Sequence, residues 1–167
     1  MADPFNLAEF LPYRLALIAE RISRRLAVEY ERSHGLSVAE WRVLANLSNL
    51  GTASVRDIQL VTNLEKSRVS RAVGRLETAK MVKKHVSAQD ARLVEIALTA
   101  KGRATLNAIV PNVREVENRL LEGLTAHQMA AFYAIIDHLH DVLDADPDAK
   151  ERVDKRAASA ASKTGAS

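Results

Sequence analysis

The stretch EKSRVSRAVGRLE, residues 65–77, has the three-to-four spacing of apolar residues that is typical of an amphipathic helix. In a projection at about 100° per residue, one arc is apolar and packs inward: Val69, Ala72, Val73 and Leu76. The opposite arc, here called the arginine face, consists of Ser67, Arg68, Ser70, Arg71, Gly74 and Arg75. Because the arginine face carries no acidic residue, its three arginines repel one another unless an anion neutralises them.

The composition of the arginine face suits a helix that lies in the major groove of DNA. Arginine binds guanine or phosphate bidentately, and serine bonds a phosphate or a base edge without adding bulk. Gly74 costs about 1 kcal/mol of helix propensity, and close approach to a phosphate backbone is one reason to accept that cost. The alternative is an ordinary surface helix, but such helices intersperse acids with bases. We therefore expect this helix to bind DNA.

The elements around this helix complete a recognisable order. Ser54 and Asp57 match a capping box that starts a short helix through about Val61, and residues 62–64 break the chain before the next helix. Residues 82–86 and 92–98 are β-branched and roughly alternating, and the polar turn between them predicts a hairpin. Two short helices followed by a basic hairpin are the order of a helix-turn-helix with a wing.

Longer amphipathic helices flank this unit. Apolar spacing and capping residues predict helices over about 12–34, from Ser37 to about 51, from Thr99 to about 124, and from Thr125 to about 144. Pro111 lies inside the third of these helices, where we expect a kink or a local break.

The predicted fold class is mainly α with a small β-hairpin wing, in a domain that covers residues 8–145. The winged helix-turn-helix domain is expected at about 37–100, and a helical dimerisation domain built from the N- and C-terminal helices at about 11–34 and 101–144. Residues 145–167 contain almost nothing to bury and are predicted to be a disordered tail.

The charge of the chain is unevenly distributed. Residues 65–103 hold ten Lys and Arg against four acids, a net charge of +6, whereas the whole chain carries +3. Such a basic block is typical of a protein that binds a polyanion, although a solvated surface has the same composition. No apolar run is long enough to span a bilayer and no signal peptide is recognisable, so we expect a cytoplasmic protein without a membrane partner.

Catalytic and metal sites are not indicated. The sequence contains no cysteine, no nucleophile elbow, no glycine-rich phosphate loop and no metal-ligand spacing, so we predict neither an enzyme nor a cofactor. Metal sensing is a rival hypothesis, but His138 and His140 are two residues apart and lie on different sides of a helix.

The chain resembles the MarR family of winged-helix bacterial regulators over about residues 8–145. The residues that carry the resemblance are Ser67 to Arg71 with Leu76-Glu77, the wing signature Asp90-Ala91-Arg92, the stretch "LTAKG" at 98–102, and "EWRVL" at 40–44. The resemblance implies a homodimer whose outer helices interlock and whose winged domains meet adjacent major grooves. It also implies that Arg92 enters the minor groove and that Asp90 orients it, which agrees with the attraction of arginine to a narrow minor groove. Glu65, where a shorter cap is more usual, departs from the pattern.

These arguments predict a set of residues in contact with a double-stranded DNA operator. The set is Ser54, Lys66, Ser67, Arg68, Ser70, Arg71, Arg75, Lys83, Lys84, Gln89, Asp90 and Arg92.

A small-molecule effector is the second expected partner. The resemblance implies a site between the dimerisation helices and the winged domain, where arginines beside aromatic residues suit an aromatic carboxylate or an aromatic acyl-CoA. The residues predicted to bind it are Tyr13, Arg14, Ile18, Arg21, Arg25, Trp41 and Arg42. Each has a structural alternative, since Trp41 also suits the core and Arg21 and Arg25 also suit solvated ion pairs.

The sequence thus predicts a ligand-responsive transcriptional regulator, a repressor that binds a palindromic operator as a dimer. The competing interpretation is a helical dimer that binds small molecules or proteins without specific DNA affinity. The dimer itself is favoured because the outer helices carry more apolar surface than a small winged domain covers, although an internal bundle satisfies the same stripes.

Overall fold

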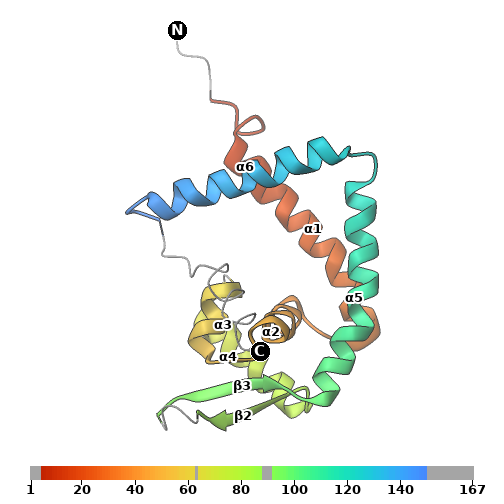
Figure 1. The fold of residues 1–167 in the computed structure, drawn as a ribbon, viewed down its shortest axis with the longest axis vertical. Helices are drawn as coiled ribbons and strands as arrows, with labels where there is room; N and C mark the ends of the chain where they lie inside the picture. The colour runs from red at the N-terminus through yellow and green to blue at the C-terminus, as the bar shows by residue number, and fades with distance from the viewer. Residues whose placement is uncertain (1–4, 63, 88–91, 150–167) are drawn as a thin grey trace, which may run out of the picture.

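The computed structural model describes residues 5–62, 64–87 and 92–149 (Figure 1). The described chain consists of six helices and three short strands. Their bounds are α1 Leu11–His34, α2 Val38–Leu50, β1 Thr52–Ala53, α3 Val55–Thr62, α4 Lys66–Thr78, β2 Val82–Val86, β3 Val94–Leu98, α5 Ala100–Leu121 and α6 Ala126–Ala145.

The core lies where α2, α3 and α4 pack together against the sheet and the inner parts of α1 and α5. The sheet is antiparallel with the order β1-β3-β2, and β2 pairs with β3 from Val82↔Leu98 to Val86↔Val94. Fully buried side chains come from α1, α2, α3, α4, β3 and α5, as Tyr30, Leu44, Ile58, Leu76, Ile96 and Ile109 illustrate. The helix-turn-helix and the base of the wing therefore share one hydrophobic core.

Capping boxes start three of the helices. Ser37 and Glu40 form one at α2, and Thr125 and Gln128 form one at α6. At α3, the Ser54 N–H and hydroxyl donate to Asp57 Oδ2 over 2.9 and 2.7 Å, and Asp57 N–H donates back to Ser54 Oγ over 3.2 Å. These capping boxes fix the starts of α2, α3 and α6 at the places that the sequence predicts.

The junction between α4, β2 and α5 explains the "LTAKG" stretch. Thr99 Oγ1 accepts from Gly102 N–H over 3.1 Å and donates to the Lys80 carbonyl over 2.7 Å. Lys101 Nζ donates to the Ala79 carbonyl just after the end of α4, over 2.8 Å. A Cβ on Gly102 would lie 2.0 Å from the Met81 carbonyl oxygen, so only glycine lets the two backbones approach this closely. The stretch thus ties α5 to the end of α4.

The predicted fold class is confirmed, with differences of detail. Strand β1 was not predicted, because two residues carry no alternation; it pairs Thr52 with Ala97 and Ala53 with Ile96. The second hairpin strand begins at Val94 rather than 92, and α5 ends at Leu121 rather than about 124. Of the two expectations for Pro111, a break is excluded, because α5 is one continuous helix.

The outer helices leave large apolar surfaces open in the single chain. In Figure 1, α6 lies at the end of the molecule opposite the β2–β3 hairpin, and α5 runs between the two. No residue of α6 is buried. No helix in the part of the chain that the structure describes is long and apolar enough to cross a membrane. The predicted tail of residues 145–167 lies outside the described residues from 150 onward.

Candidate nucleic-acid interface

Helix α4 has the two faces that its sequence predicts. Val69, Ala72, Val73 and Leu76 are all at most 1% exposed, and they anchor α4 in the core against α2 and α3. On the opposite side, every side chain of the arginine face is exposed except at Gly74, which is half-buried. Lys66, the first residue of α4, is exposed as well. The inward and outward assignments are therefore confirmed.

Two of the arginines on this face are held by partners within the chain. Arg71 Nε donates to the Ser67 carbonyl of its own helix over 3.3 Å. Arg75 Nε donates to Glu40 Oε1 of α2 over 2.9 Å, while 60% of the Arg75 side chain remains exposed. An acid thus neutralises part of the arginine face after all, and it comes from a different helix.

Glu40 is an unusual carboxylate, because only 10% of its side chain is exposed. Its Oε2 accepts from the Ser37 N–H over 2.7 Å and from the Ser37 hydroxyl over 2.5 Å, and its Oε1 accepts from Arg75. Burial alone would raise the pKa of this carboxyl, but the hydrogen bonds from Ser37 and the Arg75 guanidinium outweigh burial and hold the pKa below its ordinary value. Glu40 is therefore ionised at neutral pH.

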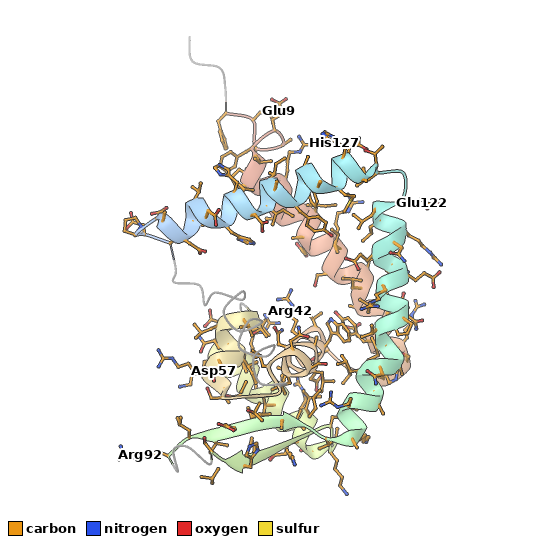
Figure 2. All side chains as sticks on the ribbon, in the orientation of Figure 1. Glu9, Arg42, Asp57, Arg92, Glu122 and His127 are labelled. Carbon is orange, nitrogen blue, oxygen red and sulfur yellow. The ribbon has the colours of Figure 1, made fainter. Side chains whose placement is uncertain are left out.

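The wing adds further basic side chains. Lys83 and Lys84 are exposed on β2, and Lys84 Nζ pairs with Glu77 at the end of α4 over 2.7 Å. Arg92 lies at the outer end of the wing (Figure 2). Gln89 and Asp90 lie outside the described residues, so the predicted pairing of Asp90 with Arg92 stays a prediction.

The outer half of the wing is held by its own polar contacts. His85 Nε2 lies 3.2 Å from Glu95 Oε2 across the two strands, and the Ser87 hydroxyl donates to Glu95 Oε1 over 2.8 Å. Ser54, the last predicted DNA contact, is committed to the α3 capping box through its N–H and its hydroxyl. A DNA phosphate at Ser54 would have to take over the donors that now bind Asp57.

A hollow of about 360 Å³ lies between α1 and α2. It is lined by Ala19, Ile22, Ser23, Leu26, Tyr30, Val38, Trp41 and Arg42. The Tyr30 and Trp41 rings stack with centroids 5.2 Å apart and planes 8° apart. Arg42 closes one side, where its Nη1 donates to the carbonyl of Thr62 at the end of α3 over 3.3 Å. In Figure 2, Arg42 lies on the side of the winged unit away from the wing.

Two of the predicted effector residues, Trp41 and Arg42, line this hollow. The other five, Tyr13, Arg14, Ile18, Arg21 and Arg25, are exposed on α1 and do not line it, and Arg25 pairs with Glu29 over 2.5 Å. These five stay predictions.

Helix α1 contributes an apolar lining to the hollow that was not predicted from the sequence. Ile22, Leu26 and Tyr30 belong to the apolar stripe of α1, and the spacing of that stripe was the signal available for locating the lining. Burial raises the pKa of the Tyr30 phenol, and nearby Glu31 raises it further while Arg42 lowers it. The phenol is therefore neutral at neutral pH.

Metal ligands do not gather in the described part of the chain. Within residues 5–62, 64–87 and 92–149, no three His, Asp or Glu side chains come close enough to hold a metal ion.

Known proteins share this architecture. Residues 34–93 match the sequence profile described as the MarR family. A solved structure of a MarR-family transcriptional regulator from Silicibacter pomeroyi is 27% identical, with a TM-score of 0.73, and the match covers 85% of this chain and 95% of that one. Residues 34–93 thus resemble the MarR family, and the fold of the chain is that of MarR-family transcriptional regulators.

Two further proteins that this chain resembles are informative. The repressor IacR of Pseudomonas putida is 26% identical over 128 residues, which are 77% of this chain and 76% of that protein. The solved structure of Bordetella bronchiseptica BpsR, a protein whose DNA binding is regulated by 6-hydroxynicotinic acid, is 25% identical with a TM-score of 0.73. That match covers 86% of this chain and all of BpsR.

Proposed function

We propose that this chain is a ligand-responsive repressor of the MarR family that binds a palindromic operator as a homodimer. The observation that carries the proposal is the arginine face, an exposed row of cations and small hydroxyls on a helix whose other face is locked into the core. Such a helix presents its side chains to a groove in a fixed orientation, because the helix itself cannot rotate. Arginine recognises guanine edges and phosphates bidentately, and serine adds contacts without bulk.

The wing extends the same proposed contact. The positive surface continues beyond α4 along the wing, with Lys83 and Lys84 on β2 and Arg92 at the outer end of the wing. We assign Arg92 to the minor groove, Asp90 to orienting Arg92, and Gln89 to a DNA contact. Ser54 and Lys66 are assigned to phosphates at the starts of α3 and α4. The full DNA-binding set is the one that the sequence predicts.

Fluorescence anisotropy with a labelled duplex tests this assignment. The duplex is selected by the wild-type protein from a random-sequence pool, and binding is titrated at several salt concentrations. Arg71→Ala should weaken binding by about 1–3 kcal/mol if Arg71 reads a base. Arg92→Ala should reduce the salt slope by about one if Arg92 neutralises a phosphate.

The matched control is Arg114→Ala, which removes an exposed arginine from α5, away from the proposed contact. Unchanged affinity for both Arg71→Ala and Arg92→Ala, or an equal loss in the control, contradicts the assignment.

The exposed outer helices support the homodimer. Large apolar side chains are 39–57% exposed along α1 and α6: Leu11, Tyr13, Leu15, Leu17, Ile18, Phe132, Tyr133, Ile135, Val142 and Leu143. A patch of this kind is rare on a monomer and is covered when two copies interlock. We therefore assign residues 11–34 and 101–144 to dimerisation and 37–100 to DNA binding. A two-fold dimer reads two half-sites about one helical turn apart, hence the palindrome.

The hollow between α1 and α2 supports an effector that is small, aromatic and anionic. The stacked Tyr30 and Trp41 rings offer an aromatic wall, and the Arg42 guanidinium offers a bidentate partner for a carboxylate. The DNA binding of BpsR, a protein of similar fold, is regulated by 6-hydroxynicotinic acid, which is an aromatic acid. An aromatic carboxylate or its CoA thioester is therefore the proposed effector class.

Arg42 also suggests how such a ligand releases DNA. Its bond to the Thr62 carbonyl holds α2 to the end of α3, directly before the turn into α4. A carboxylate that pairs with Arg42 competes for this bond and biases the position of α4. Calorimetry with a panel of aromatic acids and their CoA thioesters, on wild type and Arg42→Ala, tests the proposal. No heat and no release of DNA with any compound contradicts it.

A further inference from the structure

Three arginines share one face of α4, but only one of them is tied to another helix. Arg71 bonds its own helix through the Ser67 carbonyl, and that bond does not fix the helix against anything. Arg75 instead bonds Glu40 of α2, which lies 35 residues earlier in the chain. The exposures of the two partners differ sharply, since 60% of the Arg75 side chain and 10% of the Glu40 side chain are exposed. The acid is a buried anchor and the arginine is the part that reaches solvent.

The atoms used in this pair decide what it leaves available. Glu40 binds through Oε1 to Arg75 Nε, the nitrogen nearest the aliphatic stem. The two terminal nitrogens, Nη1 and Nη2, carry four of the five N–H donors of a guanidinium. A carboxylate on Nε therefore fixes the plane of the guanidinium without using the donors that bind a guanine edge or a phosphate bidentately.

The anchor is itself rigid. Glu40 is the N3 residue of the α2 capping box, and the Ser37 N–H and hydroxyl hold its second oxygen over 2.7 and 2.5 Å. Both oxygens thus have directional partners, and the side chain is fixed in one orientation at a helix start. A long arginine side chain loses rotamer freedom when it binds DNA, and one that is already held loses less.

We infer that Glu40 is a positioning residue for DNA recognition: the buried carboxylate of α2 holds Arg75 of α4 with its terminal donors directed outward. This inference rests on the proposed DNA-binding function. It makes Glu40, which contacts no DNA, a determinant of affinity through Arg75 alone. The opposite role is a carboxylate that competes with phosphate for Arg75 and so weakens binding.

The direction in which Glu40→Gln changes DNA affinity distinguishes these two roles. Glu40→Gln keeps an oxygen for the Ser37 cap but removes the charged acceptor from Arg75. Simple electrostatics predicts tighter DNA binding, because the variant loses a negative charge near a polyanion. Positioning predicts weaker binding, by about fivefold, because Arg75 must then be ordered at the moment of binding. Affinity is measured by anisotropy with the duplex selected by the wild-type protein from a random-sequence pool.

A double-mutant cycle shows whether the effect passes through Arg75. Glu40→Gln should have no further effect on affinity in an Arg75→Ala background, and it should keep its full effect in the matched Arg71→Ala background. Ser37→Ala serves as the structural control, because it removes the hydroxyl of the α2 cap but keeps the backbone N–H that holds Glu40 Oε2, so the Glu40–Arg75 pair stays in place. It should lower the melting temperature and change DNA affinity by less than twofold.

Each result decides the inference. Weaker binding by Glu40→Gln that disappears without Arg75 supports it. Tighter binding by Glu40→Gln overturns it in favour of competition, and an equal loss in all three backgrounds, or an equal loss from Ser37→Ala, overturns it in favour of a purely structural role. If the wild-type protein selects and binds no duplex, the proposed DNA-binding function fails instead, and that failure is seen before any variant is made.

Discussion

Helices α4 and α6 are both amphipathic, and they leave opposite faces uncovered. Helix α4 buries its apolar residues completely and exposes its cations, whereas α6 buries no residue and exposes Phe132, Tyr133 and Ile135 by 47–57%. The two helices therefore need different binding partners to cover their exposed faces. A row of exposed cations on a rigid helix is matched by a polyanion, and an exposed apolar stripe is matched by another apolar surface.

The contrast extends to how each helix is held. Helix α4 is fixed by core packing, by the Glu40–Arg75 pair and by the Lys101–Ala79 bond near its end. Helix α6 has a capping box at its start and no burial to hold it against its own chain. The DNA-reading unit is therefore expected to be folded within one subunit, and the arrangement of α6 to depend on a second subunit.

The largest effect should come from charging the apolar stripe of α6. The double variant Phe132→Asp/Ile135→Asp would bury two carboxylates between copies, at a cost of several kcal/mol. We expect a monomer by analytical ultracentrifugation and a loss of DNA affinity of at least about 100-fold, because two half-sites no longer bind together. Ala134→Asp, on the opposite side of α6, is the matched control and should remain dimeric. A dimeric double variant would break the contrast between α4 and α6.

The next effect belongs to the junction behind α4. Gly102→Ala sets a Cβ against the Met81 carbonyl, a contact that only a backbone shift relieves. We expect the free energy of unfolding to fall by about 3 kcal/mol in chemical denaturation. Dimerisation through α6 should persist at protein concentrations where the variant is folded. An unchanged stability would mean that the α4–β2–α5 junction is not a rigid part of the winged unit.

Gly74→Ala makes the same change where a Cβ meets nothing within 4 Å. The variant should gain about 1 kcal/mol of stability from helix propensity, the opposite sign to Gly102→Ala. If the arginine face lies close to a phosphate backbone, the same methyl group should weaken DNA binding while the protein becomes more stable. Anisotropy and denaturation on one preparation measure both effects. Unchanged affinity would show that Gly74 does not approach DNA closely.

The smallest expected effect is the loss of folding stability as the pH falls. The folded-state pKa of Glu40 lies below the ordinary value of 4.5, so its contribution to stability is fully present above pH 4.5 and is lost as the pH falls through the folded-state pKa. Glu40→Gln lacks this contribution at every pH. Thermal melting from pH 6 downward should therefore bring the wild type and the variant closer together in acid. A difference that stays constant would contradict the role assigned to ionised Glu40.

Local patterns in the sequence predict most of the fold. The capping boxes at Ser37, Ser54 and Thr125 and the period of the apolar residues locate five helix starts within about a residue, because both act over a single turn. Strand β1 escaped prediction since two residues have no period, and its pairing with β3 depends on chain segments more than forty residues apart. The end of α5 was placed too late because apolar spacing continues past Leu121 to Leu124.

The candidate site divides in the same way. The sequence alone predicts which side chains of α4 point outward. Once the apolar residues define the buried side of a helix, the 3.6-residue repeat determines which residues lie on the opposite side. Two features follow only from how the helices cross. One is that an acid of α2 holds Arg75. The other is that the hollow is lined by Ile22, Leu26 and Tyr30 of α1 rather than by the flanking arginines. The angle and depth of such a crossing are set by side-chain packing between elements far apart in the chain, and no local period encodes them.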